Sequence, residues 1–273
     1  MKELAIRAIS GVIYVLLLIG SLYKQEALIA LLALFGIISL LEFSNLIKLK
    51  SFIQYIIFVL LYGVFSYISL LNINLPGSDE FIQILLVITI FVNLFLIKDL
   101  FSAKRIPLFE SKRYIATTFY LSSGFVFMLL IANFQNKFSP MFLLGGFILI
   151  WVNDSAAYLV GKNFGKQKLF PSISPKKTVE GFLGGLFFAC ISSYFIAEYT
   201  ETLRFTAWLI LAIIVSVLGT FGDLIESKFK RQAEVKDSGV IMPGHGGLLD
   251  RLDSIIFAAP FIYLFLRIIH YVS

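Results

Sequence analysis

The chain has 273 residues, of which 59% are hydrophobic and only 15% are charged, and its mean hydropathy is +0.90. A soluble protein of this length needs a polar exterior, and charged residues usually make up about a quarter of such a protein. The composition therefore excludes a soluble globular protein and predicts an integral membrane protein. The net charge of +6 does not indicate nucleic-acid binding, because the lysines and arginines fall between apolar runs, as determinants of membrane topology do.

Nine apolar runs follow one another along the chain. A bilayer core about 30 Å thick needs about 20 apolar residues for each helical crossing. The runs cover residues 5–23, 27–43, 52–72, 82–98, 115–133, 141–161, 179–198, 205–226 and 252–271. We read the first run as a retained span rather than a cleaved signal peptide, because a second apolar run follows at once and no small-residue cleavage site is evident. The sequence therefore predicts an all-α fold, a polytopic transmembrane helix bundle with about nine spans.

The basic residues between the runs predict the orientation of the chain. With nine crossings, 19 of the 23 lysines and arginines fall on one face of the membrane. By the positive-inside rule that face is cytoplasmic. We therefore expect a multi-pass protein of the plasma (inner) membrane, with its N-terminus and its two long polar loops in the cytoplasm and its C-terminus outside.

Composition changes near residue 150, where Asp, Asn, Gly and Lys begin to enter the ends of the apolar runs. We therefore expect two regions: membrane scaffold spans over residues 1–140, and a catalytic membrane region with two cytoplasmic loops over residues 141–273. The single cysteine, Cys190, excludes an internal disulfide and any multi-cysteine metal site.

Asp154 lies inside the sixth run, where a carboxylate costs about 2.5 kcal/mol or more if it faces lipid. It is therefore expected to face protein, water or a cation. Tyr158 and Gly161 follow at helical spacing and share its face. A structural salt bridge to a neighbouring helix is the alternative.

The loop after the sixth run contains the cluster SPKKT, residues 174–178. Pro175 suits the first turn of a helix, and Ser174 is then placed to cap that helix. A helix N-terminus that carries hydroxyls and two lysines attracts phosphate. We expect Ser174, Lys176, Lys177 and Thr178 to form such a site, while the lysines alone also fit a role as topology markers.

The end of the eighth run carries polar residues on one helical face, namely Asp223, Glu226, Ser227 and Lys230. Such a stripe is ordinarily a solvated surface stabilised by side-chain pairs. Here it directly follows an apolar span in which two glycines permit close approach, so we expect it to belong to a site.

The segment that follows, residues 236–253, is the densest in polar groups. Four of the nine residues 239–247 are glycines, which allow tight turns and bring backbone N–H groups close to an anion. His245, among these glycines, has no apolar surface to pack against and is expected to contact phosphate or substrate. Asp250 and Asp253 share a face at the start of the ninth run. Carboxylates without a His or Cys cluster favour hard cations such as Mg²⁺.

These segments resemble the phosphatidate cytidylyltransferases (CDP-diacylglycerol synthases). The resemblance rests on SKFKR (residues 227–231), KDSG (236–239) and PGHGGLLDRLD (243–253), with DSAAYLVGK (154–162) and SPKKTVEG (174–181) also similar. Met242 departs from the family pattern, which usually has Leu, Ile or Phe there. The resemblance covers roughly residues 150 to 255, and the earlier spans match in hydropathy alone.

The resemblance implies a nucleotidyltransferase that joins CTP and phosphatidic acid to give CDP-diacylglycerol and pyrophosphate. It implies Mg²⁺ as cofactor, leaves a second cation open, and implies a homodimer. The residues expected in catalysis are Asp223, Asp250, Lys230, Arg231 and His245. The residues expected to bind substrate or phosphate are Ser174, Lys176, Lys177, Thr178, Ser227, Lys236, Gly246, Gly247 and Arg251. The residues expected to hold metal are Asp223, Asp250, Asp154 and Asp253.

Two other functions are consistent with parts of the sequence. A CTP-dependent kinase of a lipid alcohol would share nucleotide and metal but would attack the γ-phosphorus. A secondary transporter would use Asp154 and Asp223 for ion coupling, but such proteins usually show internal repeats with interrupted helices, which are not evident here.

Overall fold

The structure is a computed structural model that describes residues 2–73 and 76–272. Helices form almost all of it. Their bounds are α1 Lys2–Ser21, α2 Gln25–Leu46, α3 Ile53–Leu71, α4 Ser78–Phe101, α5 Glu110–Ile115, the π-helix η1 Ala116–Ser122, α6 Ser123–Ala132, the 3-10 turn η2 Phe134–Asn136, α7 Met141–Phe164, α8 Val179–Thr200, α9 Phe205–Gln232 and α10 Leu249–Val272. Two short strands, β1 Lys168–Phe170 and β2 Ser174–Thr178, lie between α7 and α8.

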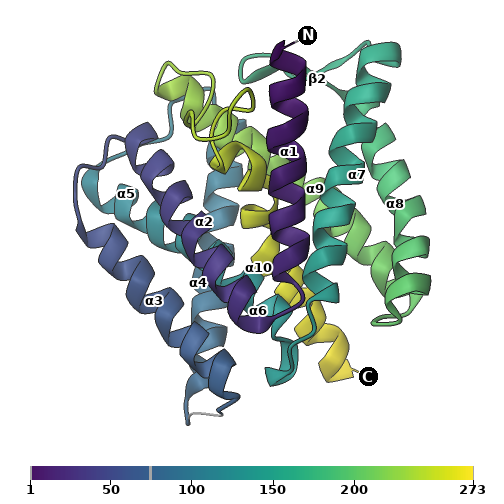
Figure 1. Cartoon of the computed structure of the whole chain (residues 1–273). Helices are drawn as coiled ribbons and strands as arrows, with labels where there is room; N and C mark the ends of the chain where they lie inside the picture. The colour runs from purple at the N-terminus through teal and green to yellow at the C-terminus, as the bar shows by residue number, and fades with distance from the viewer. Residues whose placement is uncertain (1, 74–75, 273) are drawn as a thin grey trace.

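The helices run up and down as a bundle, with the N-terminus at one end and the C-terminus at the other (Figure 1). In the described residues, eight helical segments are long and apolar enough to cross a membrane, and α5, η1, α6 and η2 together make one of them. The apolar part of α1, Ile6–Ser21, is shorter than these eight. The predicted all-α transmembrane bundle is confirmed.

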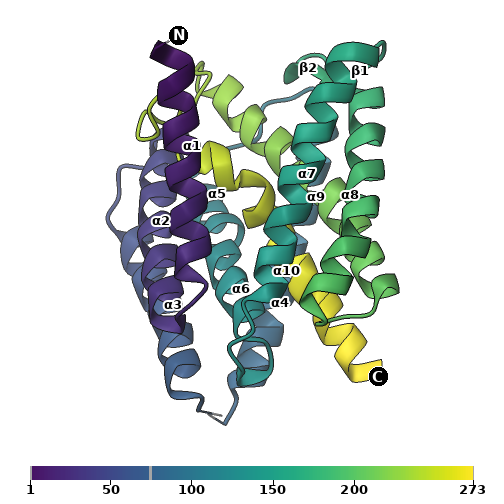
Figure 2. The ribbon, with the colours of Figure 1, turned by 45° about the vertical axis from the view of Figure 1, so that its right-hand side comes forward.

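The hairpin of β1 and β2, the N-terminus and the loop before α10 lie at the same end of the bundle (Figures 1 and 2). This end also carries the connections from α2 to α3 and from α4 to α5. The basic segments of the sequence therefore gather at one end, which we call the basic end.

Helix α10 forms the centre of the bundle and runs obliquely through it (Figure 2). All residues from 252 to 260 are buried, although they include the polar side chains of Asp253 and Ser254. A buried carboxylate is costly unless it is paired or hydrogen-bonded. The first turn of α10 is therefore the place where the fold must satisfy polar groups inside an apolar core.

The fifth predicted span is interrupted by the π-helix η1. Beside the backbone turns of this π-helix, the side-chain hydroxyl of Ser122 donates to the Thr117 carbonyl at 2.8 Å. The π-helix carries Tyr120, which is fully buried against Phe229 and Phe257, one on each of the two helices that bear the site described below.

The sequence predicts a helix that starts at Pro175 with Ser174 as its N-cap, and this prediction is wrong. Residues 174–178 form β2, which pairs antiparallel with β1, Lys168 opposite Thr178 and Phe170 opposite Ser174. The residue before a proline favours extended backbone, and a proline is tolerated in an edge strand. Helix α8 begins only at Val179, with Thr178 as its N-cap.

Thr178 stabilises the start of α8 through its side chain. Its buried Oγ1 accepts a hydrogen bond from the Gly181 N–H at 3.1 Å. Replacing an N-cap hydroxyl by alanine costs about 1 kcal/mol. We therefore expect Thr178→Ala to lower the thermal stability of the detergent-solubilised protein, while Thr178→Ser, which keeps the hydroxyl, melts close to wild type. Equal melting of the two variants would contradict this role of the hydroxyl.

Candidate active site

Lys230 joins two carboxylates where α9 and α10 meet. Its ammonium forms an ion pair with Glu226, one turn earlier on α9, and lies 2.6 Å from Oδ1 of Asp250 at the start of α10. All three side chains are almost completely buried. Helix α9 extends six residues beyond the predicted run, because the pair four residues apart lets charged residues continue the helix inside the protein.

Lys177, on β2, forms an ion pair with Asp223 on α9. Its Nζ lies 2.5 Å from Oδ2 of Asp223. Both side chains are about 30% exposed, so this pair forms the open side of the site. Burial alone lowers the pKa of Lys177, but the adjacent Asp223 carboxylate outweighs it and raises the pKa above its usual range. Lys177 is therefore a fixed positive charge at neutral pH.

Asp154 and Asp253 complete the group. The charges of Lys177 and Asp223 act on Asp154, and the charges of Asp223, Lys230 and Asp154 act on Asp253. Asp253 is buried, with Oδ1 accepting from its neighbour's N–H at 2.7 Å. Asp154 accepts from Asn153 at 3.3 Å and has no basic group within ion-pair distance in the described part of the chain, so the structural salt bridge considered for it is not formed.

We call this group the carboxylate–lysine cluster. It consists of Asp154, Asp223, Glu226, Asp250 and Asp253 with Lys177 and Lys230. With all groups ionised it has an excess of three negative charges. It lies at the basic end of the bundle and is assembled from α7, β2, α9 and α10. Four segments that the sequence marked separately therefore meet in one place.

The glycine-rich loop between α9 and α10 folds back on Asp250. This carboxylate accepts hydrogen bonds from the backbone N–H groups of Gly247 at 2.7 Å and Ser238 at 3.0 Å. Gly246 has a φ of 90°, which L-residues rarely adopt, and this turn places the loop against Asp250. The Gly247 N–H, expected to bind phosphate, is thus engaged by a carboxylate of the protein itself.

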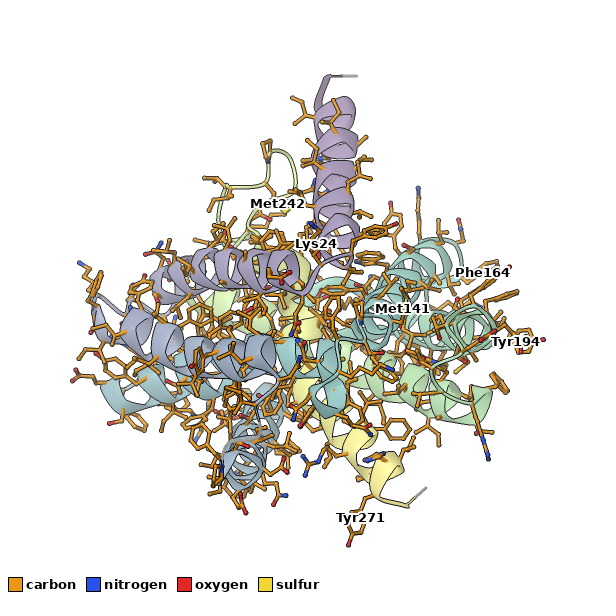
Figure 3. All side chains as sticks on the ribbon, turned by 60° about the horizontal axis from the view of Figure 1, so that its bottom comes forward. Lys24, Met141, Phe164, Tyr194, Met242 and Tyr271 are labelled. Atoms are coloured by element: carbon orange, nitrogen blue, oxygen red, sulfur yellow. The ribbon has the colours of Figure 1, made fainter. Side chains whose placement is uncertain are left out.

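His245 contacts α1 rather than the carboxylates. Its Nδ1 lies 2.8 Å from the hydroxyl of Ser10, which also donates to the carbonyl of Pro243. The loop that carries Met242 lies beside α1 in Figure 3. Burial, and then the charges of Arg251 and Arg7, lower the pKa of His245, so the ring is neutral at pH 7.

The remaining predicted residues lie around the cluster. Arg231 is exposed and donates to the carbonyls of Ile173 and Val235, and so ties α9 to the β1–β2 turn. Arg251 is exposed and donates to the His245 carbonyl. Ser227 is buried and donates to Asp223 at 3.2 Å. Lys176 and Lys236 are exposed and Ser174 is half-buried. Their role in binding phosphate stays a prediction.

Two acidic residues of the site region were missed as site residues. Glu226 was noticed only as part of the polar stripe, yet it is the most buried carboxylate of the cluster. Glu42, on α2, is buried and accepts hydrogen bonds from the start of α10. Each is an ionisable residue at or in an apolar run, which is itself a signal of function.

The donor chemistry of the cluster fits a hard divalent cation. All its acceptors are oxygens, and the buried side-chain oxygen of Asn153 has no hydrogen-bond partner among the described residues. Over residues 2–73 and 76–272, no three His, Cys, Asp or Glu side chains already converge on one metal position. Lys177 and Lys230 lie between the carboxylates instead, so they supply the positive charge there.

The fold and the site define a class: a helical membrane protein that carries, at one end, a partly buried cluster of acids and lysines suited to bring anionic groups together. A sequence model of the cytidylyltransferase family matches residues 5–269. The chain therefore belongs to the cytidylyltransferase family.

Its relatives are similar over almost their whole length. Proteins named phosphatidate cytidylyltransferase from Staphylococcus aureus (strain COL) and Staphylococcus haemolyticus (strain JCSC1435) are 32% and 33% identical to this chain over 268 residues. A protein of the same name from Staphylococcus epidermidis (strain ATCC 12228 / FDA PCI 1200) is 31% identical. Each alignment covers 96% of this chain and 98% of the relative.

Proposed function

We propose that the protein is a phosphatidate cytidylyltransferase, which transfers the cytidylyl group of CTP to phosphatidic acid and gives CDP-diacylglycerol and pyrophosphate. The relatives' shared name supports this reaction. The observation that carries it to this chain is the carboxylate–lysine cluster, in which fixed ammonium groups and excess carboxylates lie together at the basic end of the bundle.

The reaction needs no serine or cysteine nucleophile, because a phosphate monoester is itself nucleophilic. A phosphate oxygen of phosphatidic acid forms a bond to the α-phosphorus of CTP. The bond from that phosphorus to the oxygen bridging to the β-phosphate breaks, and pyrophosphate leaves. The protein must bring two anions together and stabilise the charge that moves onto the leaving group.

Lys177 is the ammonium best placed to bind phosphate, because it lies on the open side of the cluster and stays protonated. Arg231 and Arg251 are exposed and can add guanidinium contacts. Lys230 is held between Glu226 and Asp250 and keeps its charge in a fixed position. These four residues orient the phosphates and offset their repulsion.

Mg²⁺ is the proposed cofactor, and a second cation is left open. Asp223 and Asp253 would hold it with Asp154, since both oxygens of Asp250 already accept hydrogen bonds. When bound, the cation neutralises phosphate charge and makes the α-phosphorus more electrophilic.

The proposed orientation follows from charge. The basic end faces the cytoplasm by the positive-inside rule, where CTP is found and where the headgroup of an inner-leaflet lipid is within reach. The bacterial relatives support placement in the plasma membrane. The homodimer and the division at residue 140 stay predictions.

Purified protein in detergent should convert CTP and phosphatidic acid only with Mg²⁺ present. Label on the α-phosphate should enter the lipid and label on the γ-phosphate should leave as pyrophosphate. EDTA should stop both, and added Mg²⁺ should restore them. If γ-label enters a lipid alcohol instead, the protein is a lipid kinase and the proposal is wrong.

A further inference from the structure

Glu42 is a buried carboxylate of α2 that binds the start of α10, some 200 residues later in the chain. Only 4% of the residue is exposed. Its two oxygens accept from the N–H groups of Leu249 at 2.8 Å and Leu248 at 3.1 Å, and from the hydroxyl of Ser238 at 3.3 Å. These donors belong to the loop that carries predicted site residues and to the first residue of α10.

The loop is shaped around this carboxylate. A Cβ atom added at Gly239 would come within 2.3 Å of one Glu42 oxygen, and a Cβ added at Gly247 within 2.7 Å of the other. Real Cβ atoms do not approach so closely, so a larger residue at either position would displace the Glu42 carboxylate or the loop, and at Gly247 it would also meet the Ser238 hydroxyl at 2.1 Å. The two glycines therefore fit the loop to a carboxylate at this position.

The contact is favourable for electrostatic reasons. The first N–H groups of a helix have no partner within the helix, and its N-terminus carries a partial positive charge. Glu42 supplies a full negative charge and two acceptors at that point of α10. These N–H groups are thereby removed from the groups that can bind a substrate phosphate.

Glu42 and Asp250 hold the same stretch of loop from two sides. Ser238 donates from its hydroxyl to Glu42 and from its N–H to Asp250, while Gly247 donates to Asp250 just before the two N–H groups bound by Glu42. Asp250 is in turn the partner of Lys230. A shift of the first turn of α10 would therefore move both charges.

We propose that Glu42 is a positioning residue of the transferase site: its carboxylate fixes the first turn of α10 and thereby the Asp250–Lys230 pair. Glu42 touches no substrate and acts through the loop. The inference rests on the proposed function for its kinetic consequence, but the loop contact itself can be tested without turnover.

The test compares Glu42→Gln and Glu42→Asp with Glu26→Gln, a control at an exposed position of the same helix. In Glu42→Gln the side-chain amide turns an N–H₂ group toward backbone donors, so one contact is lost with little change in volume. We expect kcat to fall about 100-fold with the KM for CTP little changed, as for a small misplacement of reacting groups. Glu42→Asp keeps the charge and should recover part of kcat.

Hydrogen–deuterium exchange supplies the readout that does not depend on activity. The amides of residues 247–249 should exchange faster in Glu42→Gln than in wild type or Glu26→Gln, with α7 and α8 unchanged. Unchanged exchange, or a wild-type kcat per folded molecule in Glu42→Gln, would overturn the inference. If wild type makes no CDP-lipid but the exchange result holds, the proposed function fails while the Glu42 contact stands.

Discussion

The Asp223→Asn variant is expected to lose about 1,000-fold in turnover while folding and inserting like wild type. The substitution removes one of the negative charges of the cluster and the partner of Lys177, which lies 2.5 Å away. Both side chains are about 30% exposed, so the loss of this pair should cost about 1 kcal/mol of stability or less. Activity and stability are thus expected to separate at this residue.

Steady-state turnover against Mg²⁺ concentration checks this expectation, with melting in detergent measured on the same samples. The matched control is Glu198→Gln. Glu198 is exposed near the C-terminus of α8, the end away from the cluster, and this variant should behave as wild type. Turnover of Asp223→Asn within tenfold of wild type would remove Asp223 from the proposed metal ligands.

Lys230→Met should lower both stability and turnover. It leaves Glu226 and Asp250 buried next to each other without the ammonium that separates them. Removing one partner of a buried ion pair costs about 3–5 kcal/mol. For a chain of this size we expect an apparent melting temperature about 10 °C lower.

A double variant separates the two effects. Lys230→Met with Glu226→Gln removes one carboxylate together with the ammonium, so the melting temperature should recover in part. Turnover should stay low, because the fixed positive charge is still absent. A single variant that melts like wild type, or a double variant with normal turnover, would show that Lys230 lacks the assigned role.

The sequence was most informative about the segments that cross the membrane, because lipid restricts their structure. A membrane span must be a long apolar helix, so hydropathy alone located the helices to within a few residues. Hydropathy failed where polar residues are satisfied inside the protein. Helix α9 continues past Glu226 because Lys230 neutralises that carboxylate. A hydropathy profile does not detect such an ion pair, so it ends the helix too early. The β1–β2 hairpin was missed because Pro175 suits an edge strand as well as a helix start.

The candidate site residues were recognisable one by one, but their pairings were not. Nothing in a single sequence shows that Lys177 meets Asp223 from a hairpin, or that Asp250 binds the loop before it. Glu42 was harder still. It stands alone in an apolar run, and two of its three partners are backbone N–H groups, which every residue except proline carries and which leave no trace in the sequence.

The contact between Ser10 and His245 bears on how members of this family can be recombined. A chimera that joins the first 140 residues of one relative to the remainder of another would bring together an α1 and a glycine loop that were never selected as neighbours. Crossover points inside the apolar middle of α3 or α4 would still divide α1 and α2 from that loop. Productive exchanges would therefore carry α1, α2 and residues 233–248 together, although these segments lie at opposite ends of the gene.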